Sequence, residues 1–338
     1  MDSLTQAVLG AAVGAAVLGR RAGRKAPLWG ALLGTLPDLD VLVPFGSPVA
    51  DFTYHRGHSH ALFWLTLAAP AFAWLITRLH RDQRAEFRGW WLLCCTCLVT
   101  HTLLDALTIY GTQLGLPFTD HPFGTGSVFV IDPAYTLPLL LGVLCALTLR
   151  DRRLGHRLNA VGLGVGTAYL AFGLAAQAHV ADIARAELAR QGLAHERLVV
   201  TPTPFNGVLW RVLAMQPDGY CEGFRSLLDG AAPLVPRCFP SEPAALDPLA
   251  DAWAVERLRW FTKGYYSVRR EGEEIVFRDL RMGQEPAYAF TFVVGTVRDG
   301  RTVPLVPEVQ RVVTFEDRAD GALQWLWARI FDPAIPPP

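Results

Sequence analysis

Long apolar stretches fill the first 180 residues of the chain, and shorter alternating segments follow them. A run of about 20 apolar residues predicts a helix that can cross the hydrocarbon core of a bilayer. We therefore expect an α-helical membrane bundle of about six hydrophobic helices over residues 1–180. The six stretches are Leu4 to Leu18, Leu28 to Val43, Ala61 to Leu79, Trp90 to Tyr110, Ala134 to Leu149 and Leu158 to His179.

The second stretch is interrupted, because Leu28 to Val43 contains Pro37, Asp38 and Asp40. Ionised side chains are costly inside a bilayer, and irregular backbone is tolerated there only where protein or a watery cavity covers it. We therefore expect a broken or re-entrant helix at this point. The first stretch lacks the basic region and cleavage site of a signal peptide, so we expect it to remain as a helix.

Residues 181–338 are predicted to form a small α+β domain. Ala181 to Gln191 continues the last apolar stretch as a helix, and Asp247 to Thr262 has apolar residues at helical spacing. Alternating β-branched and aromatic residues predict a mixed or mainly antiparallel sheet. The predicted strands are Arg197 to Thr201, Val208 to Met215, Ser267 to Val268, Glu274 to Leu280, Tyr288 to Val297 and Arg311 to Phe315.

The composition supports a membrane protein. Hydrophobic residues make up 51% of the chain and charged residues only 18%, below the share usual in soluble proteins. The 31 basic and 31 acidic residues give a formal net charge of zero. The overall charge therefore gives no reason to expect nucleic acid as a partner, and the sequence leaves the oligomeric state open.

Basic residues predict the orientation of the bundle, because they follow every second apolar stretch. Loops rich in arginine and lysine face the cytoplasm, so six crossings place the other loops and residues 181–338 outside it. The outer loops, Phe45 to His60 and Gly111 to Asp132, contain almost no lysine or arginine. The basic residues are Arg20, Arg21, Arg24, Lys25, Arg78, Arg81, Arg84, Arg88, Arg150, Arg152, Arg153 and Arg157.

Histidine and aspartate gather where the predicted helices reach the outer face. In the segment HTLLD the two polar residues are four positions apart, so their side chains share one face of a helix and can reach one ion. The segments are LPDLD with Asp38 and Asp40, HRGHSH with His55, His58 and His60, HTLLD with His101 and Asp105, and IDP with Asp132.

Several carboxylates crowded at a partly dry site repel one another unless a cation compensates. The sequence therefore predicts a divalent metal site, and histidine with carboxylate but without thiolate suits zinc, manganese or iron. The number of ions stays open. For Asp2, Asp120 and His121 the sequence leaves a ligand role and an ordinary loop role both open.

Five of the six cysteines fall into two sets. Cys94, Cys95 and Cys97 lie inside an apolar stretch, where we expect them to pack in the core rather than to bind zinc. Cys221 and Cys238 lie in the second domain and can form a disulfide if this domain faces an oxidising compartment. Their state depends on the topology.

The ordered motifs resemble the YdjM-like family of bacterial inner-membrane proteins, described as membrane-bound metal-dependent hydrolases. The resemblance covers roughly the first 180 residues and rests on MDSLTQAVLG, GALLGTLPDLD, HRGHSH and HTLLD. It is closest at His101 and Asp105, then at one aspartate of LPDLD and one histidine of HRGHSH. Many family members have the pair TH near the start, where this chain has Thr5 and Gln6, so the resemblance does not supply a ligand from the first helix.

This family is remotely similar to zinc-dependent phospholipases C and related nucleases, which implies hydrolysis of a phosphoester at an inner-membrane site. We expect a membrane lipid or a lipid-linked intermediate as the substrate. The expected metal ligands are Asp38, Asp40, His60, His101, Asp105 and Asp132. His55 or His58 would complete the ligand shell or act as the acid, and Arg56 would contact a phosphate or a lipid headgroup.

Two other functions fit the same residues. Carboxylates on a broken membrane helix are also typical of an ion-coupled transporter, although the cytoplasmic halves of the predicted helices contain few polar residues. A metal-stabilised scaffold that presents the second domain is the other alternative. An enzyme would keep an open position on the metal, whereas a scaffold would fill every position with protein.

Overall fold

The computed structural model describes residues 1–311 and 321–337. Within them the chain forms two compact units: unit 1 contains Met1–Val43, His55–Leu174 and Pro204–Asn206, and unit 2 contains Pro44–Tyr54, Ala175–Thr203 and Gly207–Pro338. The division expected near residue 180 falls inside one continuous helix, α7 (Arg152–Arg190). This helix continues because residues 174–190 contain no proline or glycine that would end it.

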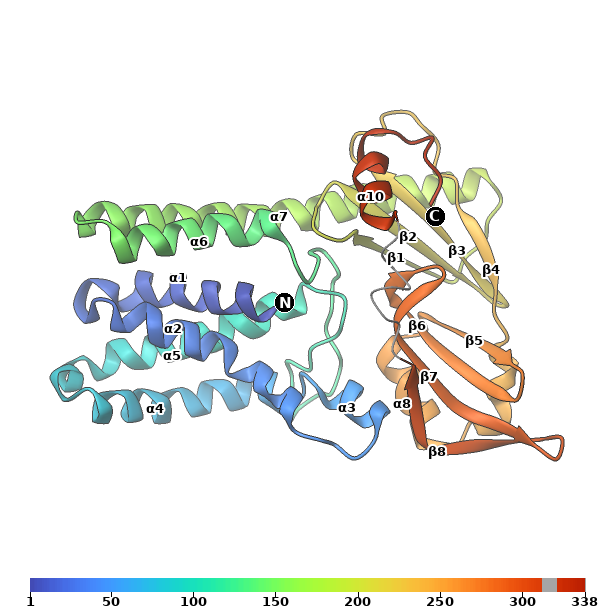
Figure 1. Ribbon diagram of the computed structural model, residues 1–338, viewed down its shortest axis with the longest axis horizontal. Helices are drawn as coiled ribbons and strands as arrows, with labels where there is room; N and C mark the ends of the chain where they lie inside the picture. Colours follow the sequence, from blue (N-terminus) through green and yellow to red (C-terminus); the bar gives the residue numbers. More distant parts are fainter. Residues whose placement is uncertain (312–320, 338) are drawn as a thin grey trace. The chain divides into compact units, whose positions relative to one another are not determined.

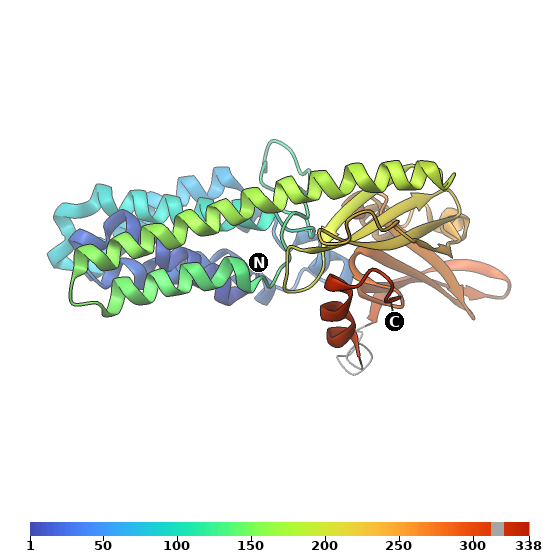
Figure 2. The same ribbon diagram turned by 90° about the horizontal axis from the view of Figure 1, so that it is seen from above.

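Unit 1 is a bundle of helices that run side by side (Figure 1, Figure 2). Among the described residues, α1, α4 and α7 are long and apolar enough to cross a membrane, against six crossings expected from the sequence. Helix α6 is apolar but shorter. The bundle consists of α1 (Ser3–Ala22), α2 (Lys25–Thr35), α4 (Leu62–Leu79), α5 (Phe87–Ala106), α6 (Pro133–Thr148) and the first part of α7, with 3-10 segments η1 (Pro37–Leu42), η2 (His58–His60) and η3 (Arg81–Glu86).

The interruption expected within the second apolar stretch is present. Helix α2 has 11 residues and ends at Thr35. At 1.5 Å per residue it spans roughly 17 Å, about half of the hydrocarbon core. The 3-10 turn η1 begins at Pro37, which cannot donate a main-chain hydrogen bond, and it contains both aspartates of LPDLD.

Helices α1 and α2 approach closely because glycines lie where they meet. A Cβ atom on Gly10 would lie 2.1 Å from the Gly30 carbonyl oxygen, and a Cβ atom on Gly34 would lie 2.5 Å from the Gln6 carbonyl oxygen. Small residues at such spacing let two helix backbones pack together in a membrane. The packing holds the end of α2 against α1, next to the polar segments.

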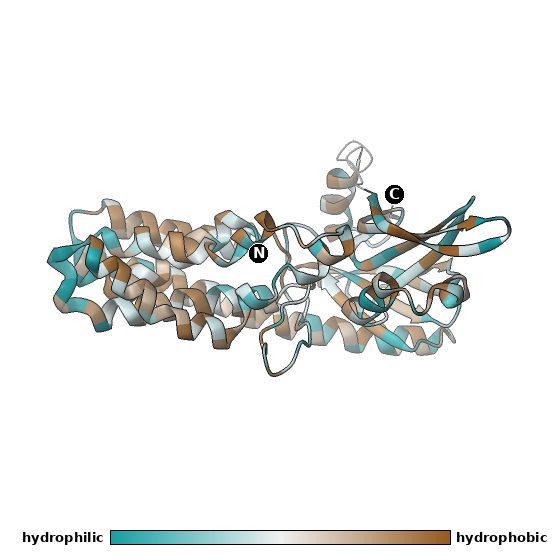
Figure 3. Ribbon diagram, turned by 90° about the horizontal axis from the view of Figure 1, so that it is seen from below, coloured by the Kyte–Doolittle hydropathy of each residue, from teal (hydrophilic) through white to brown (hydrophobic). Residues whose placement is uncertain are grey.

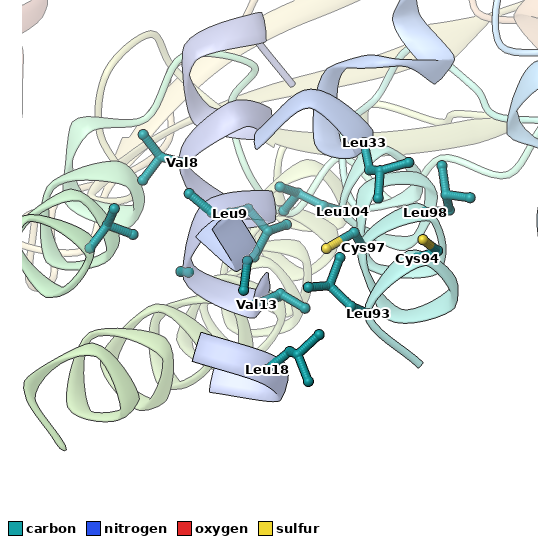
Figure 4. Packing of buried hydrophobic residues seen from close by; sticks show 14 of the residues in the cluster. Val8, Leu9, Val13, Leu18, Leu33, Leu93, Cys94, Cys97, Leu98 and Leu104 are labelled. Atoms are coloured by element: carbon teal, nitrogen blue, oxygen red, sulfur yellow. The ribbon is translucent and has the colours of Figure 1, made fainter. Parts of the chain in front are cut away.

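The core of unit 1 is formed by α1, α2, α4, α5 and α6, and Figure 4 shows the part where α1, α2 and α5 meet. Cys94 and Cys97 are buried in it, and the Cys97 thiol donates to the Gly10 carbonyl oxygen at 3.5 Å. This confirms the expectation that these thiols are core residues. The labelled core residues are Val8, Leu9, Val13, Leu18, Leu33, Leu93, Cys94, Cys97, Leu98 and Leu104.

The three basic loops meet at one end of unit 1. Arg21 pairs with Glu86 at 3.1 Å, which joins the loop after α1 to η3. Arg24 donates to the Leu147 carbonyl oxygen at 3.0 Å, which joins the same loop to the end of α6. Figure 3 shows hydrophilic residues at this end, while hydrophobic residues dominate along the helices. The alternate loops therefore lie on one side, as the positive-inside pattern predicts.

Unit 2 contains two four-stranded antiparallel sheets, each in consecutive strand order. The turn between the last two strands uses Asp299 and Gly300, both with positive φ, which is typical of a two-residue hairpin. One sheet contains β1 (Arg197–Pro202), β2 (Leu209–Gln216), β3 (Gly219–Ser226) and β4 (Arg237–Pro240), and the other contains β5 (Tyr266–Glu271), β6 (Glu274–Gln284), β7 (Ala287–Arg298) and β8 (Arg301–Arg311). The prediction of mainly antiparallel pairing is confirmed.

Several elements of unit 2 differ from the sequence prediction. Strand β3 was not among the predicted strands; it contains Glu222 and Arg225, yet all its residues are buried. Strand β8 contains two prolines and lies at the edge of its sheet, where proline is tolerated. Of the predicted strand Arg311 to Phe315, only Arg311 is among the described residues. The helix expected from Asp247 is shorter: a 3-10 segment, η4 (Pro243–Leu249), precedes α8 (Trp253–Thr262).

Polar contacts and a disulfide hold unit 2 together. The Arg211 guanidinium pairs with Glu222 at 2.5 Å on the first sheet and donates to the Leu280 carbonyl oxygen of the second sheet at 2.7 Å. A disulfide joins Cys221 of β3 to Cys238 of β4. The disulfide that the sequence left open is therefore formed in this structure.

Two short helices of unit 2 had no counterpart in the prediction. Helix α3 (Pro48–Tyr54) comes from the loop after η1, and its Phe52 ring lies 4.9 Å from the Phe261 ring of α8 and 4.3 Å from the Phe290 ring of β7. This aromatic packing explains why Pro44–Tyr54 groups with unit 2. Helix α10 (Ala322–Phe331) attaches through Arg329, which pairs with Asp229 at 2.8 Å.

Candidate metal centre

Four polar side chains from three separate elements meet in unit 1. Asp38 lies on η1, His60 ends η2, and His101 and Asp105 lie on α5. One ligand atom from each lies within 4.8 Å of the others. His60 Nε2 is 3.1 Å from His101 Nε2, 3.3 Å from Asp38 Oδ1 and 3.2 Å from Asp105 Oδ2. We call these four residues the His/Asp group.

The end of α2 orients the His101 ring. Nδ1 of His101 lies 2.6 Å from the Gly34 carbonyl oxygen. A carbonyl oxygen can only accept a hydrogen bond, so Nδ1 carries the proton, and Nε2 of the neutral ring then has a lone pair. This Nε2 atom is 3.6 Å from Asp38 Oδ1 and 3.4 Å from Asp105 Oδ2. The close packing of α1 on α2 therefore helps to direct a lone pair into the group.

A serine and a carboxylate orient the His60 ring. The Ser59 hydroxyl donates to Asp40 Oδ2, because a carboxylate can only accept. The same hydroxyl oxygen lies 2.9 Å from His60 Nδ1, so it accepts the proton of Nδ1. His60 Nε2 then also presents a lone pair to the group. The Thr102 hydroxyl donates to the His60 carbonyl oxygen at 2.6 Å and holds η2 against α5.

Asp105 is engaged at one oxygen only. Its Oδ1 atom accepts from Gln6 Nε2 at 3.0 Å, pairs with Arg56 Nη2 at 3.3 Å and contacts the main-chain nitrogen of Met1. Its Oδ2 atom is buried and has no hydrogen-bond donor among the described residues. A buried carboxylate oxygen without a donor is costly. Oδ2 faces the two imidazole Nε2 atoms instead.

The residues of the His/Asp group fit a divalent metal ion. Two imidazole nitrogens and two carboxylate oxygens direct lone pairs toward one another, which is repulsive unless a cation lies between them. Such a nitrogen and oxygen donor set suits zinc, and manganese and iron also accept it. Both histidines have the hydrogen-bonded Nδ1 atom that metal-binding histidines normally have. The group can therefore hold a metal ion.

Asp40 lies beside the group rather than in it. Its Oδ1 atom is 2.7 Å from His55 Nδ1, and its Oδ2 atom accepts from the Arg56 main-chain N–H at 3.0 Å. Together with the contact to Ser59, these hydrogen bonds use both oxygens. We expected Asp40 to be a metal ligand. In the structure its side chain instead orients His55 directly and His60 through Ser59.

Arg56 is buried beside Asp105, although we expected it to contact a phosphate or a lipid headgroup. Its guanidinium donates to the Thr108 hydroxyl at 3.1 Å and lies 5.1 Å from the centre of the Tyr110 ring. Its backbone has a positive φ of 61°, which is uncommon for a residue with a side chain. The hydrogen bond to Asp40 stabilises this conformation, so Arg56 positions Asp105 from inside the fold.

The other expected residues lie outside the His/Asp group. Asp132 caps α6 by accepting from the Ala134 N–H at 3.0 Å, and it also accepts from the Tyr169 hydroxyl at 2.7 Å. Asp2 caps α1, with its side chain accepting from the Thr5 N–H. These two carboxylates therefore have helix-capping roles. His58, Asp120 and His121 are exposed.

Ser59, Gln6 and Gly34 support the group, a role that was not predicted for them. Ser59 lies between two histidines of HRGHSH, and Gln6 occupies the position at which the chain departs from the family's TH pair. Their places in these motifs are the features of the sequence that could have indicated a role at the site. The contact with the Gly34 carbonyl oxygen could not be predicted from the residue type, because every residue has this main-chain oxygen.

Comparisons with known proteins found a family model and curated relatives. The YdjM inner membrane protein family matches residues 1–180. An uncharacterized protein, YfhP of Bacillus subtilis (strain 168), is 29% identical over 144 residues, which cover 39% of this chain and 42% of the relative. The inner membrane protein YbcI of Escherichia coli (strain K12) is 35% identical over 97 residues, which cover 28% of this chain and 54% of the relative.

The chain spans about half the length of these curated relatives. No solved structure matches it. The family match contains every residue of the His/Asp group, together with Asp40, His55 and Ser59, and it extends over more than half of the chain. The chain belongs to the YdjM inner membrane protein family.

Proposed function

We propose that the chain is a membrane-bound, metal-dependent hydrolase that cleaves a phosphoester in a lipid or lipid-linked substrate. The observation that carries this proposal is the convergence of four lone pairs from Asp38, His60, His101 and Asp105. These residues would hold the ion, most suitably zinc. When bound, such an ion lowers the pKa of a coordinated water and offsets the charge that develops on the phosphate.

His55 is the proposed proton donor. Hydrolysis joins the water oxygen to phosphorus and breaks the bond to the leaving oxygen, which then needs a proton. The His55 ring is held by Asp40 through Nδ1, its side chain is 22% exposed, and its ring centre lies 6.1 Å from that of His60. It can give a proton to the leaving oxygen and recover the proton that the attacking water releases. His58, exposed at the start of η2, is the alternative donor.

Exposed apolar residues beside the group support a lipid substrate. Val41 and Leu42 of η1 are 69% and 76% exposed, directly after Asp38 and Asp40. Large exposed apolar side chains at this position suit contact with acyl chains rather than with water. Exposed Trp64 near the start of α4 is typical of the boundary between membrane and water, where lipid headgroups lie.

The distribution of charge and the disulfide support a site at the outer face of the inner membrane. The basic loops lie at the opposite ends of α4 and α5 from His60 and Asp105, and such loops normally face the cytoplasm. In unit 2 the pair Cys221 and Cys238 forms a disulfide, which is usual outside the cytoplasm. We propose a multi-pass topology with unit 2 extracytoplasmic.

Metal analysis of purified protein tests this proposal. The full chain, purified in detergent without chelators, would be compared with His101→Ala and Asp105→Ala for metal content and for turnover of a generic phosphodiester. We expect bound metal in the wild type and loss of both metal and turnover in the two variants. His195→Ala and Asp182→Asn make similar changes outside the group and should keep both properties.

The possible results separate the competing functions. Full turnover in His101→Ala and Asp105→Ala would overturn the assignment of the site. Absence of metal from the wild type would favour an ion-coupled transporter. Stoichiometric metal without turnover of any phosphoester, lipid-linked substrates included, would favour a metal-stabilised scaffold.

A further inference from the structure

A concave site separate from the His/Asp group lies in unit 1, at the end where the basic loops meet. It is a cavity of about 720 Å³ between the turn after α1 and the turn after α6. Its wall includes Ala15, Gly19 and Ala146, whose small side chains leave the space open. We call it the basic cavity, because its charged lining residues are all cations: Arg24, Lys25, Arg150 and Arg152.

The positive charge of the basic cavity is only partly neutralised. Lys25 pairs with Asp82 at 2.7 Å. For Arg24, Arg150 and Arg152, no carboxylate partner occurs among the described residues. The neighbouring carboxylate, Asp151, accepts from the main-chain N–H groups at the start of α7. A concave surface with three uncompensated guanidinium groups attracts an anion, and guanidinium groups favour phosphate.

A histidine lies on the wall of the same cavity. His156 packs against α1, where a Cβ atom on Gly19 would lie 2.6 Å from its ring carbon Cε1. Its Nδ1 atom is buried and has no hydrogen-bond partner among the described residues. The cavity wall therefore includes an imidazole ring as well as the cations.

We propose that the basic cavity binds the phosphate of an anionic phospholipid headgroup. The adjoining helix α2 begins at Lys25 and then exposes Leu28 and Leu32, which are 61% and 59% exposed. Cations followed within one or two helical turns by exposed leucines match a headgroup followed by acyl chains. The site is independent of the His/Asp group and of the proposed hydrolase activity.

Lipid titration of the purified full chain tests this proposal. Delipidated protein in detergent would be titrated with dioleoyl phosphatidylglycerol, with dioleoyl phosphatidylcholine and with inorganic phosphate, and the bound species counted by native mass spectrometry. The test variant is Arg24→Gln with Arg152→Gln. The control variant is Arg153→Gln with Arg157→Gln, which removes the same charge from the start of α7 without changing residues that line the cavity.

We expect the wild type to prefer phosphatidylglycerol and the test variant to bind it roughly 10- to 30-fold more weakly, since each arginine near an anionic headgroup contributes about fivefold. The control variant should bind like the wild type. Equal weakening in the two variants would overturn the proposal, because it would show general surface attraction. Displacement of the lipid by an equal concentration of inorganic phosphate would assign the cavity to a soluble phosphate ligand instead.

Discussion

The two units neutralise their buried polar groups in different ways. In unit 2, buried arginines pair with carboxylates: Arg211 with Glu222 at 2.5 Å, and Arg281 with Asp279 at 2.6 Å. In unit 1, Arg56 engages only one oxygen of Asp105, and the remaining ligand atoms of the His/Asp group face one another. The pairs in unit 2 are complete without any further partner. The His/Asp group has no such pairing at these atoms and can hold a metal ion there.

The largest effect expected in unit 2 comes from breaking one of its pairs. Arg211→Met leaves Glu222 buried without its main counter-charge, which should lower the free energy of unfolding by about 3–5 kcal/mol. Replacing both residues, Arg211→Met with Glu222→Leu, should recover most of this loss because no isolated charge remains. Chemical denaturation of the detergent-purified chain measures both values. A double variant as unstable as the single one would contradict the view that Arg211 and Glu222 need only each other as partners.

The disulfide is expected to contribute slightly less. Cys221 and Cys238 are separated by 17 positions, and closing a loop of this size stabilises a fold by about 3 kcal/mol. Cys221→Ser should lower the stability of unit 2 by about this amount without changing the metal content of unit 1. A reducing agent should act equally on the wild type. If the reducing agent and the substitution both left the denaturation midpoint unchanged, the disulfide would not form in solution.

A smaller effect should follow from Ser59→Ala. The substitution removes the acceptor of His60 Nδ1, so the ring loses the contact that directs its lone pair into the group. Loss of such a supporting contact typically weakens metal binding about 10- to 100-fold. Competition with a chelator of known affinity measures the change, with Ser47→Ala as the control. Unchanged affinity would mean that Ser59 does not orient the ligand.

The smallest effect concerns Lys263, a partly buried cation of unit 2. Burial, with repulsion from Arg281, lowers the pKa of Lys263 from 10.5 to about 8. Between about pH 8 and pH 10.5 the unfolded chain binds more protons at this residue than the folded chain, so its contribution to stability should rise with pH. The expected gain is on the order of 1 kcal/mol, since the side chain is partly exposed. Denaturation at pH 7 and pH 10 measures it.

Lys263→Met provides the control for this pH dependence. The variant has no titrating group at this position, so it should be more stable than the wild type at pH 7, and the difference should shrink by pH 10. A difference that grew with pH would mean that the folded state favours the charged amine. In that case the charge of Lys263 would be compensated in the folded state, as the charges of Arg211 and Arg281 are.

The sequence predicted correctly that His101 and Asp105 share one face of a helix, because both lie on one regular helix. A separation of four residues places two side chains on one helical face whatever the surrounding fold. The helical first half and its basic loops were predictable for a similar reason: hydrophobic length and loop charge act locally. The YdjM family match confirms the resemblance that these motifs carried.

The sequence could not distinguish Asp38 from Asp40, because both lie on a 3-10 turn whose direction depends on its neighbours. It also missed α3, since the packing of Phe52 on Phe261 and Phe290 joins segments more than 200 positions apart. Strand β3 was also not predicted; its buried Glu222 pairs with Arg211 of the neighbouring strand β2. These outcomes depend on partners that are distant in sequence.

The sequence by itself determined a membrane-type helical half, alternate basic loops, a mainly antiparallel second half and a set of polar residues suited to metal binding. Periodicity, length and local charge are sufficient for such properties. Only the tertiary structure decided which four residues converge, which carboxylates cap helices, and that Ser59 and Gly34 orient the imidazole rings. The reason is geometric: hydrogen-bond donors and acceptors must meet within about 3 Å, and packing between distant segments sets these distances.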